Sequence, residues 1–133
     1  MPVAANESYP EDLRYHREHD WARVEGEEAV LGITWYAQDA LGELVHFEAP
    51  EVGATVSKDQ AYAEVESVKA VSDVIAPLSG EVLEVNQKAV AEPETINEDP
   101  YGEGWLVRIR VADAGELDAL LDAEAYKAHL AEQ

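Results

Sequence analysis

The sequence contains no cysteine, the first of several absences that limit what this chain can be. Without cysteine it cannot form a disulfide framework, a thiolate nucleophile, an iron–sulfur cluster or a cysteine-based zinc site. No stretch approaches the roughly 20 consecutive apolar residues that a membrane-spanning helix needs. The first residues also lack the basic stretch and apolar region of a secretory signal peptide. We therefore expect a soluble protein of the cytoplasm.

Positive charge is scarce as well. Nine Lys and Arg residues face 29 Asp and Glu residues, which gives a formal net charge of −20 and a sequence pI near 4.2. Such a surface repels phosphate backbones and anionic lipids, and the few cations are scattered along the chain rather than clustered in a basic patch. We expect neither nucleic acid nor a membrane among its partners.

Length and composition favour one folded domain over residues 1–133. The apolar fraction of 47% is high enough to supply a hydrophobic core, which excludes disorder as the default state. Residues 1–12 show no periodicity and are expected to form a loose tail. Residues 113–133 change to helical spacing, and Asp113 followed by Glu116 at the capping-box interval predicts a helix start there. The apolar face of this helical segment consists of Leu117, Leu120, Leu121, Tyr126 and Leu130.

Short strands account for most of the remaining chain. Trp21–Val24 and Ala29–Ile33 alternate around an acidic turn, which predicts a β-hairpin. Residues 36–41 have a short helical spacing, with Thr34 as the expected N-cap and Gly42 as the expected end. We predict a mostly β fold with a short inner helix and C-terminal helices.

The strand pattern also repeats weakly. Gly42–Phe47 resembles Gly80–Val85 at an offset of 38 residues, and each run is followed by a polar stretch and another apolar strand. Two similar β units that each expose an apolar face would bury it by packing on each other. Chance similarity between short runs of this kind is the alternative explanation.

Lys69 lies between the two units, in a chain with only four lysines. The surrounding alternating stretch contains no Gly or Pro before Pro77, so a turn at Lys69 must be tight and made of ordinary residues. A Schiff-base lysine needs an apolar or cationic pocket, whereas Glu64, Glu66 and Asp73 stand near this one in sequence and favour the charged amine. Catalysis by the free amine is therefore disfavoured, but covalent modification at an exposed tip is not. A plain solvated lysine is the alternative.

No enzyme motif is present. His16 and His19, with Glu18 and Asp20, form a possible metal cluster, but they lack a helix signal and the His-Glu-x-x-His spacing. We expect a polar loop there rather than a metal site. His46 is expected to be a half-exposed strand residue rather than a general base.

Together these segments resemble the glycine cleavage system H proteins. The lipoylation segment of that family is similar to Glu66-Ser67-Val68-Lys69-Ala70 together with Ser72–Val74 and Ala76–Val82. Further similar segments follow the family's order: His19–Trp21, Gly32–Gln38, Leu41–Val45, Pro50–Gly53 and Asn97–Trp105. The resemblance covers about residues 13–130, and the combined motifs are highly specific.

The resemblance implies a flattened β-barrel or sandwich of two quasi-symmetric halves, with lipoic acid in amide linkage to Lys69. The flanking Glu66, Ser67, Val68 and Ala70 would form the lipoylation context. The implied role is a carrier rather than an enzyme, shuttling the aminomethyl group of glycine. The implied partners are a pyridoxal-phosphate-dependent glycine decarboxylase, a tetrahydrofolate-dependent aminomethyltransferase, dihydrolipoamide dehydrogenase and a lipoate-attaching enzyme.

The resemblance further implies that Asp20, Asp73 and Glu18 line a cleft for the aminomethyl-lipoyl group. Three departures from the family pattern occur: Asp20 replaces a longer Glu, Glu18 stands where Ser is common, and Trp35 replaces an Asp. The sequence offers no account of Trp35.

Three other functions are compatible with parts of the sequence. A lipoyl domain of a 2-oxo acid dehydrogenase favours Asp before Lys-Ala, where this chain has Val68. A biotin carrier would have Met on both sides of the lysine. A non-lipoylated interaction module would keep the fold and leave Lys69 unmodified.

The acid excess predicts that stability depends on salt. If the surface is adapted to a salty cytosol, screening of its self-repulsion will raise the unfolding midpoint between low and molar salt. Denaturation at both salt concentrations measures this. A midpoint that does not move would instead favour negative charge as an ordinary means of solubility.

Overall fold

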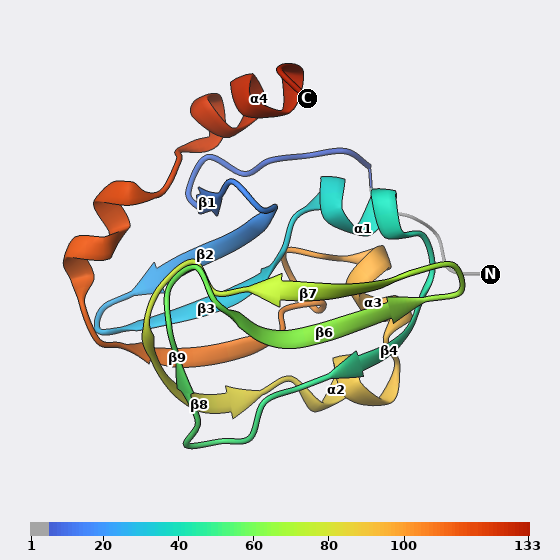
Figure 1. Ribbon diagram of the computed structural model, residues 1–133, viewed down its shortest axis with the longest axis horizontal. Coiled ribbons are helices and arrows are strands. Elements are labelled where there is room, and N and C mark those ends of the chain that lie inside the picture. The colour runs from blue at the N-terminus through green and yellow to red at the C-terminus, as the bar shows by residue number, and fades with distance from the viewer. Residues whose placement is uncertain (1–5) are drawn as a thin grey trace.

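A computed structural model of the chain describes residues 6–133 (Figure 1). The strands are β1 (Arg14–His16), β2 (Asp20–Glu25), β3 (Glu28–Ile33), β4 (Leu44–Glu48), β5 (Thr55–Val56), β6 (Ala61–Ser67), β7 (Val71–Ile75), β8 (Gly80–Val85) and β9 (Val107–Val111). The helices are α1 (Trp35–Leu41), α2 (Gln87–Ala91), α3 (Glu94–Glu98), the 3₁₀ helix η1 (Ala114–Ala119) and α4 (Ala123–Ala131). Among the described residues, no helix is long and apolar enough to cross a membrane.

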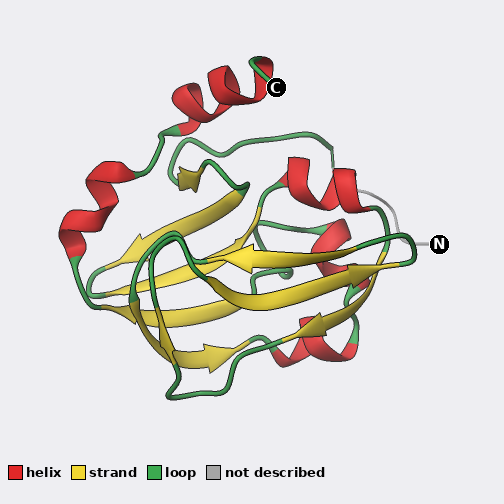
Figure 2. Cartoon of the chain, in the orientation of Figure 1, coloured by secondary structure: helices red, strands yellow, loops and turns green. Residues whose placement is uncertain are grey.

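The strands form two antiparallel sheets, as Figure 2 shows. A six-stranded sheet has the order β1-β2-β3-β9-β8-β5, and a three-stranded sheet has the order β4-β6-β7. The prediction of a mostly β fold is confirmed. Within residues 6–133 no strand pairing joins the two sheets, so the structure is a sandwich of two sheets rather than a closed barrel.

The weak sequence repeat is confirmed by the strand pairing. β4 pairs with β6 and β8 pairs with β9, so each repeated run forms the first strand of an equivalent pair, one in each sheet. Each pair also has one register shift, between Leu44 and His46 in the first and between Val82 and Glu84 in the second. Both positions of the second shift lie 38 residues after those of the first, which is the offset of the sequence repeat.

Two hydrophobic clusters hold these elements together. The main cluster is formed by inward-facing residues of both sheets, including Phe47, Val65 and Ile109, together with residues of α2 and α3. The second cluster is aromatic and lies under α4, where Tyr15 stacks on Tyr126 with ring centroids 4.7 Å apart. Because β2 contributes to both clusters, it is buried on both faces over its first half.

The short inner helix is confirmed as α1. Thr34 caps it by accepting a hydrogen bond from the Ala37 N–H at 3.3 Å, and the Gly42 N–H closes it on the Gln38 carbonyl at 2.9 Å. Gly42 has a φ of +86°, which glycine adopts without the steric cost that a Cβ would bring. Trp35 is half-buried at the start of α1, and its backbone N–H donates to the Tyr101 hydroxyl at 2.9 Å.

The C-terminal segment differs from the predicted single apolar face. Leu117 and Leu120 pack on the main cluster, whereas Leu121, Tyr126 and Leu130 pack on the aromatic cluster. The chain turns between η1 and α4, so one continuous helical face could not form. Asp113 caps η1 as predicted, but the Glu116 carboxylate accepts hydrogen bonds from Ser79 instead of completing a capping box.

The predicted N-terminal tail extends over 1–12, of which 1–5 lie outside the described residues. The Tyr15 hydroxyl donates to the Pro10 carbonyl at 2.7 Å, and the Tyr101 hydroxyl donates to the Ser8 carbonyl at 2.6 Å. Tyr9 contacts Tyr126 edge to face, with ring centroids 5.4 Å apart. Residues 8–10 are therefore attached to the aromatic cluster.

A single added methyl group should test the packing of the aromatic cluster. A Cβ built on Gly32 would lie 2.5 Å from the ring of the fully buried Trp21, which is its cross-strand partner. We expect Gly32→Ala to lower the free energy of unfolding by about 1–3 kcal/mol, because the buried ring has little room to move. Urea denaturation measures this loss, and the smaller ring in a Trp21→Phe background should reduce it. An unchanged loss in that background would rule out the clash as its cause.

Candidate functional site

Lys69 lies at the tip of the β6–β7 hairpin, in the tight turn that the sequence predicts. The Ser67 N–H donates to the Ala70 carbonyl at 2.8 Å and closes the turn. The Ser67 hydroxyl accepts from the Ala70 N–H at 3.1 Å and from the Lys69 N–H at 3.3 Å. None of these residues has a positive φ, so the turn needs no glycine. One buried serine therefore fixes the backbone that presents the lysine.

The side chains at the tip are exposed. Val68 is 80% exposed, and Lys69 and Val71 also face solvent. Three of the four lysines form an ion pair: Lys58 with Asp59, Lys88 with Glu103 and Lys127 with Glu124. Within the described residues, Lys69 is the one lysine without a carboxylate partner. Its amine is accessible and not engaged by the protein.

The side chain of Lys69 lies beside Gly42 at the end of α1. The chain that leaves α1 passes beside the β6–β7 turn in Figure 1. A Cβ built on Gly42 would lie 3.6 Å from the Lys69 Cε. Buried Asn97 fixes this junction, since its Nδ2 donates to the Gly42 carbonyl at 2.8 Å and its Oδ1 accepts from the Leu44 N–H at 2.9 Å. The sequence places Asn97 in a turn-rich run, and no local signal reveals this role.

The carboxylates near Lys69 in sequence lie on the two strands of the hairpin. Glu64 and Asp73 are opposite each other in the register, and Glu66 is opposite Val71. Glu66 and Asp73 are exposed. These carboxylates give the two hairpin strands an acidic surface next to the turn that holds Lys69.

Asp20 lies in a different environment, at the buried start of β2. It is only 2% exposed, and the backbone N–H of Ile75 donates to its carboxylate. Burial raises the pKa of Asp20 well above its ordinary value, the Ile75 hydrogen bond opposes this rise, and the charge of Glu18 adds to it. Of the three predicted cleft residues, the structure brings Glu18 and Asp20 together, whereas Asp73 lies on the exposed side of the hairpin.

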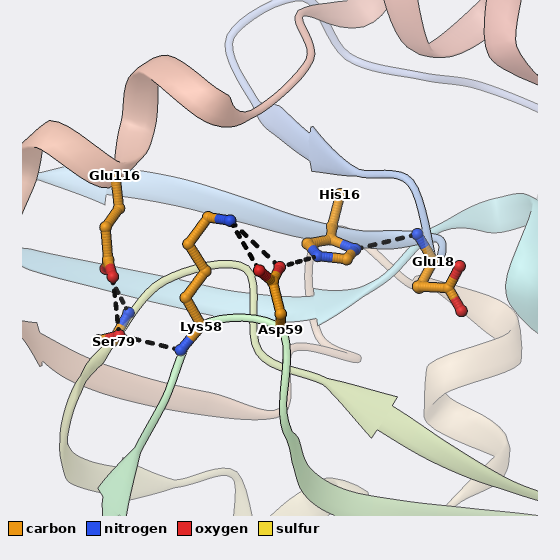
Figure 3. A network of polar contacts seen from close by, with 6 residues as sticks. All are labelled: His16, Glu18, Lys58, Asp59, Ser79 and Glu116. Atoms are coloured by element: carbon orange, nitrogen blue, oxygen red, sulfur yellow. Dashed lines mark hydrogen bonds and ion pairs between the residues drawn. The ribbon is translucent and has the colours of Figure 1, made fainter.

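The turn before Asp20 is held from two directions. His16 donates from Nε2 to Asp59 at 2.7 Å, because its Nδ1 accepts the Glu18 N–H at 3.0 Å (Figure 3). On the other side, His19 Nδ1 lies 2.8 Å from the Tyr126 hydroxyl of α4. His19 and Asp59 are also the two non-glycine residues with positive φ within residues 6–133. The His16–Asp20 segment is a supported polar turn whose two imidazoles face different partners.

Figure 3 also shows how this turn is connected to the rest of the sheet. Lys58 forms an ion pair with Asp59 at 3.0 Å, and the Lys58 N–H donates to the Ser79 hydroxyl at 2.9 Å. Ser79 in turn donates its N–H and its hydroxyl to Glu116 of η1. The network joins residues of β1, of η1 and of two loops that are far apart in sequence, so no motif marks it.

The arrangement suits a modified lysine better than a catalytic one. The amine is exposed at the hairpin tip and is not enclosed in an apolar pocket of the kind that a Schiff-base lysine needs. A primary amine that is exposed and unpaired is available for amide formation with a carboxylic acid supplied by another protein. A rigid hairpin would then present the attached group to the surroundings.

Comparisons with known proteins give a consistent result. The family profile described as "Glycine cleavage H-protein" matches residues 13–133. The chain is 55% identical to a glycine cleavage system H protein of Anaeromyxobacter sp. (strain K) over 124 residues, covering 93% of this chain and 97% of that protein. It is 53% identical to one of Symbiobacterium thermophilum over 119 residues, covering 90% and 93%. The crystal structure of a glycine cleavage system H protein from Mycobacterium marinum superposes with a TM-score of 0.85 at 44% identity, covering 92% and 98%.

The burial of Asp20 predicts a pH-dependent effect of its replacement. Because its pKa is raised in the folded state, the stability it contributes is present below its ordinary value of 3.8 and is lost as the pH rises through the folded-state pKa. We expect Asp20→Asn to be more stable than the wild type by about 1–3 kcal/mol near neutral pH, with a smaller difference at about pH 4.

Urea denaturation between about pH 4 and about pH 8 measures this difference. Asp73→Asn, at an exposed position, controls for the loss of one negative charge. A stability difference for Asp20→Asn that is the same at every pH would contradict the interpretation.

Proposed function

We propose that this chain, which belongs to the glycine cleavage H-protein family, carries lipoic acid in amide linkage to the Nζ of Lys69. The observation that carries the assignment to Lys69 is its position: it is the one lysine of the described chain that is exposed at a hairpin tip without an ion-pair partner. Exposed Glu66, Val68 and Ala70 form the local surface that a lipoate-attaching enzyme would recognise, and buried Ser67 fixes the backbone that presents it.

The chain is a carrier subunit in glycine cleavage and not an enzyme in its own right. Lipoic acid supplies a dithiolane whose sulfur takes up the aminomethyl group of glycine and later releases it. The partners are the glycine decarboxylase, which provides this group, the aminomethyltransferase, which receives it, and dihydrolipoamide dehydrogenase, which restores the disulfide.

A carrier of this kind needs a rigid body and a mobile reactive end. The Ser67 turn keeps the hairpin backbone in one conformation, while the exposed Lys69 stem is free to move. A tether of this length raises the effective concentration of the carried group at each docked enzyme. Amide formation also removes the ammonium charge of Lys69, so the acidic hairpin no longer attracts a cation at that position.

The acidic residues would then act on the cargo, whose amino group is a cation near neutral pH. A carboxylate stabilises a nearby ammonium group, so Asp20 and Glu18, and Asp73 on the neighbouring hairpin surface, are the residues we assign to hold it between transfers. We also propose that the protein works in the cytoplasm, where it would meet the three partner enzymes. Fractionation of cells that express it tests that location.

Lys69→Arg tests the attachment site. The side chain is exposed and makes no ion pair, so the variant should unfold at the same urea concentration as the wild type. Its intact mass should lack the lipoyl increment, because the arginine side chain does not accept the acyl group. A reconstituted glycine cleavage assay should show no turnover.

Lys88→Arg is the matched control, since Lys88 is also partly exposed but lies on α2. This variant should be lipoylated and active. Lipoylated, active Lys69→Arg would refute the assignment. An unmodified wild-type protein from a lipoate-sufficient cell would favour a non-lipoylated interaction module instead.

A further inference from the structure

The helix α4 is attached to the rest of the molecule through few side chains. Ala123 and Tyr126 are buried, and His129 and Leu130 are partly buried, whereas the other residues of the helix are exposed. In Figure 1 the helix lies outside the two sheets, on the side of β1. An element with few buried contacts opens at a lower free energy than the core. The polar contacts of α4 therefore have a large influence on whether it stays docked.

These polar contacts converge on the turn before β2. His19 Nδ1 lies 2.8 Å from the Tyr126 hydroxyl, which also lies 2.8 Å from Oγ1 of Thr34. His129 donates from Nε2 to the Arg17 carbonyl at 3.1 Å. The rings of His19 and His129 are 6.0 Å apart between centroids. Two imidazoles, one from each side, thus join α4 to this turn.

The protons of this chain of hydrogen bonds are all placed when His19 is neutral. Thr34 accepts the Ala37 N–H at 3.3 Å as the cap of α1, and its hydroxyl can donate to Tyr126. Tyr126 then donates to an unprotonated Nδ1 of His19. A protonated Nδ1 would have to donate to Tyr126 and reverse the chain, so the fully buried Thr34 hydroxyl would lose its acceptor. The geometry therefore favours neutral His19.

The charges around His19 act in the same direction. Groups from three segments face its ring: Tyr126, His129 and Gln133 of the C-terminal segment, Tyr36 of α1, and His16 and Glu18 of its own turn. Burial lowers the pKa of His19, a hydrogen bond with the Gln133 side chain opposes this, and the charge of His129 lowers the pKa further. The charge of Glu18 raises it and that of His16 lowers it, both more weakly.

The sign of the pH dependence follows from the lowered pKa. The stability that neutral His19 contributes is present above its ordinary pKa of 6.5 and is lost as the pH falls through the folded-state pKa. Protonation then places two positive charges side by side at the base of α4, because His129 titrates in the same range.

We propose that His19 and His129 form an acid-sensitive latch, which holds α4 against the turn before β2 when both are neutral and releases the helix when they are protonated. The sheets stay folded in the released state, since within residues 6–133 the main cluster is built without α4. Release of Tyr126 removes a hydrogen-bond partner from Thr34, the cap of α1, which ends beside Lys69. The latch needs no lipoyl group and is independent of the carrier function.

The first experiment measures amide hydrogen exchange of the full, unlipoylated chain at about pH 8 and about pH 5.5, on either side of the ordinary histidine range. Rates are corrected for the intrinsic pH dependence of exchange and compared between α4 and β9. We expect the protection of α4 to fall about tenfold or more at the lower pH, while that of β9 is unchanged. Equal protection of α4 at both pH values, or an equal loss in both elements, would overturn the proposal.

His19→Asn tests the first histidine. Asparagine tolerates the positive φ of this position and can accept the Tyr126 hydroxyl, but it does not titrate. We expect α4 in this variant to have the same protection at both pH values. The matched control is His46→Asn, which removes a 56% exposed imidazole on β4 and should keep the wild-type response. A wild-type response in His19→Asn, or its loss in His46→Asn, would contradict the latch.

His129→Gln tests the second histidine, because the glutamine amide can still donate to the Arg17 carbonyl without carrying a charge. Removing the second positive charge should move the midpoint of α4 opening to lower pH. An unchanged midpoint would show that His129 takes no part and would overturn the two-histidine latch. All three measurements use unlipoylated protein, so an active Lys69→Arg variant would end the carrier assignment without affecting them.

Discussion

The rest of this structure depends on one constraint: a primary amine must stay exposed and unpaired in a chain that has a large excess of carboxylates. The Ser67 turn meets this constraint with ordinary residues, because one buried hydroxyl accepts two backbone N–H groups at the tip. Lys58, Lys88 and Lys127 are held in ion pairs. Within the described residues, Lys69 forms no such pair at the exposed hairpin tip, and this makes its amine available for acylation.

The hairpin can serve as a platform only because the sheets behind it are rigid. The two repeated strand pairs, with bulges at equivalent positions, bury the main cluster between the sheets. Asn97 then connects the end of α1 to the start of β4, directly beside the Lys69 stem. The two sheets thus supply the rigid body, and the Lys69 side chain supplies the mobile part.

At the start of β2 a charged residue is buried, in contrast to the exposed lysine at the hairpin tip. Asp20 is placed where its charge is disfavoured, and the turn before it is held in a left-handed conformation at His19 by contacts from His16 and Tyr126. Strained backbone and unpaired buried polar groups reduce stability, and proteins keep them mainly where they bind or react. Hydrogen bonds from Tyr126 of α4 to His19 and from His16 to Asp59 support this turn. They explain how the fold tolerates the strained backbone and the buried carboxylate.

The sequence by itself determined the mostly β architecture, the β2–β3 hairpin, the caps of α1, the repeat and the tight turn at Lys69. These features depend on alternation, capping residues and spacing, which are local along the chain. Only the tertiary structure decided which distant groups meet: Asn97 with Gly42, and His16 with Asp59. Contacts between segments far apart in the chain leave no periodic signal, so these parts of the site could not be predicted from the residues alone.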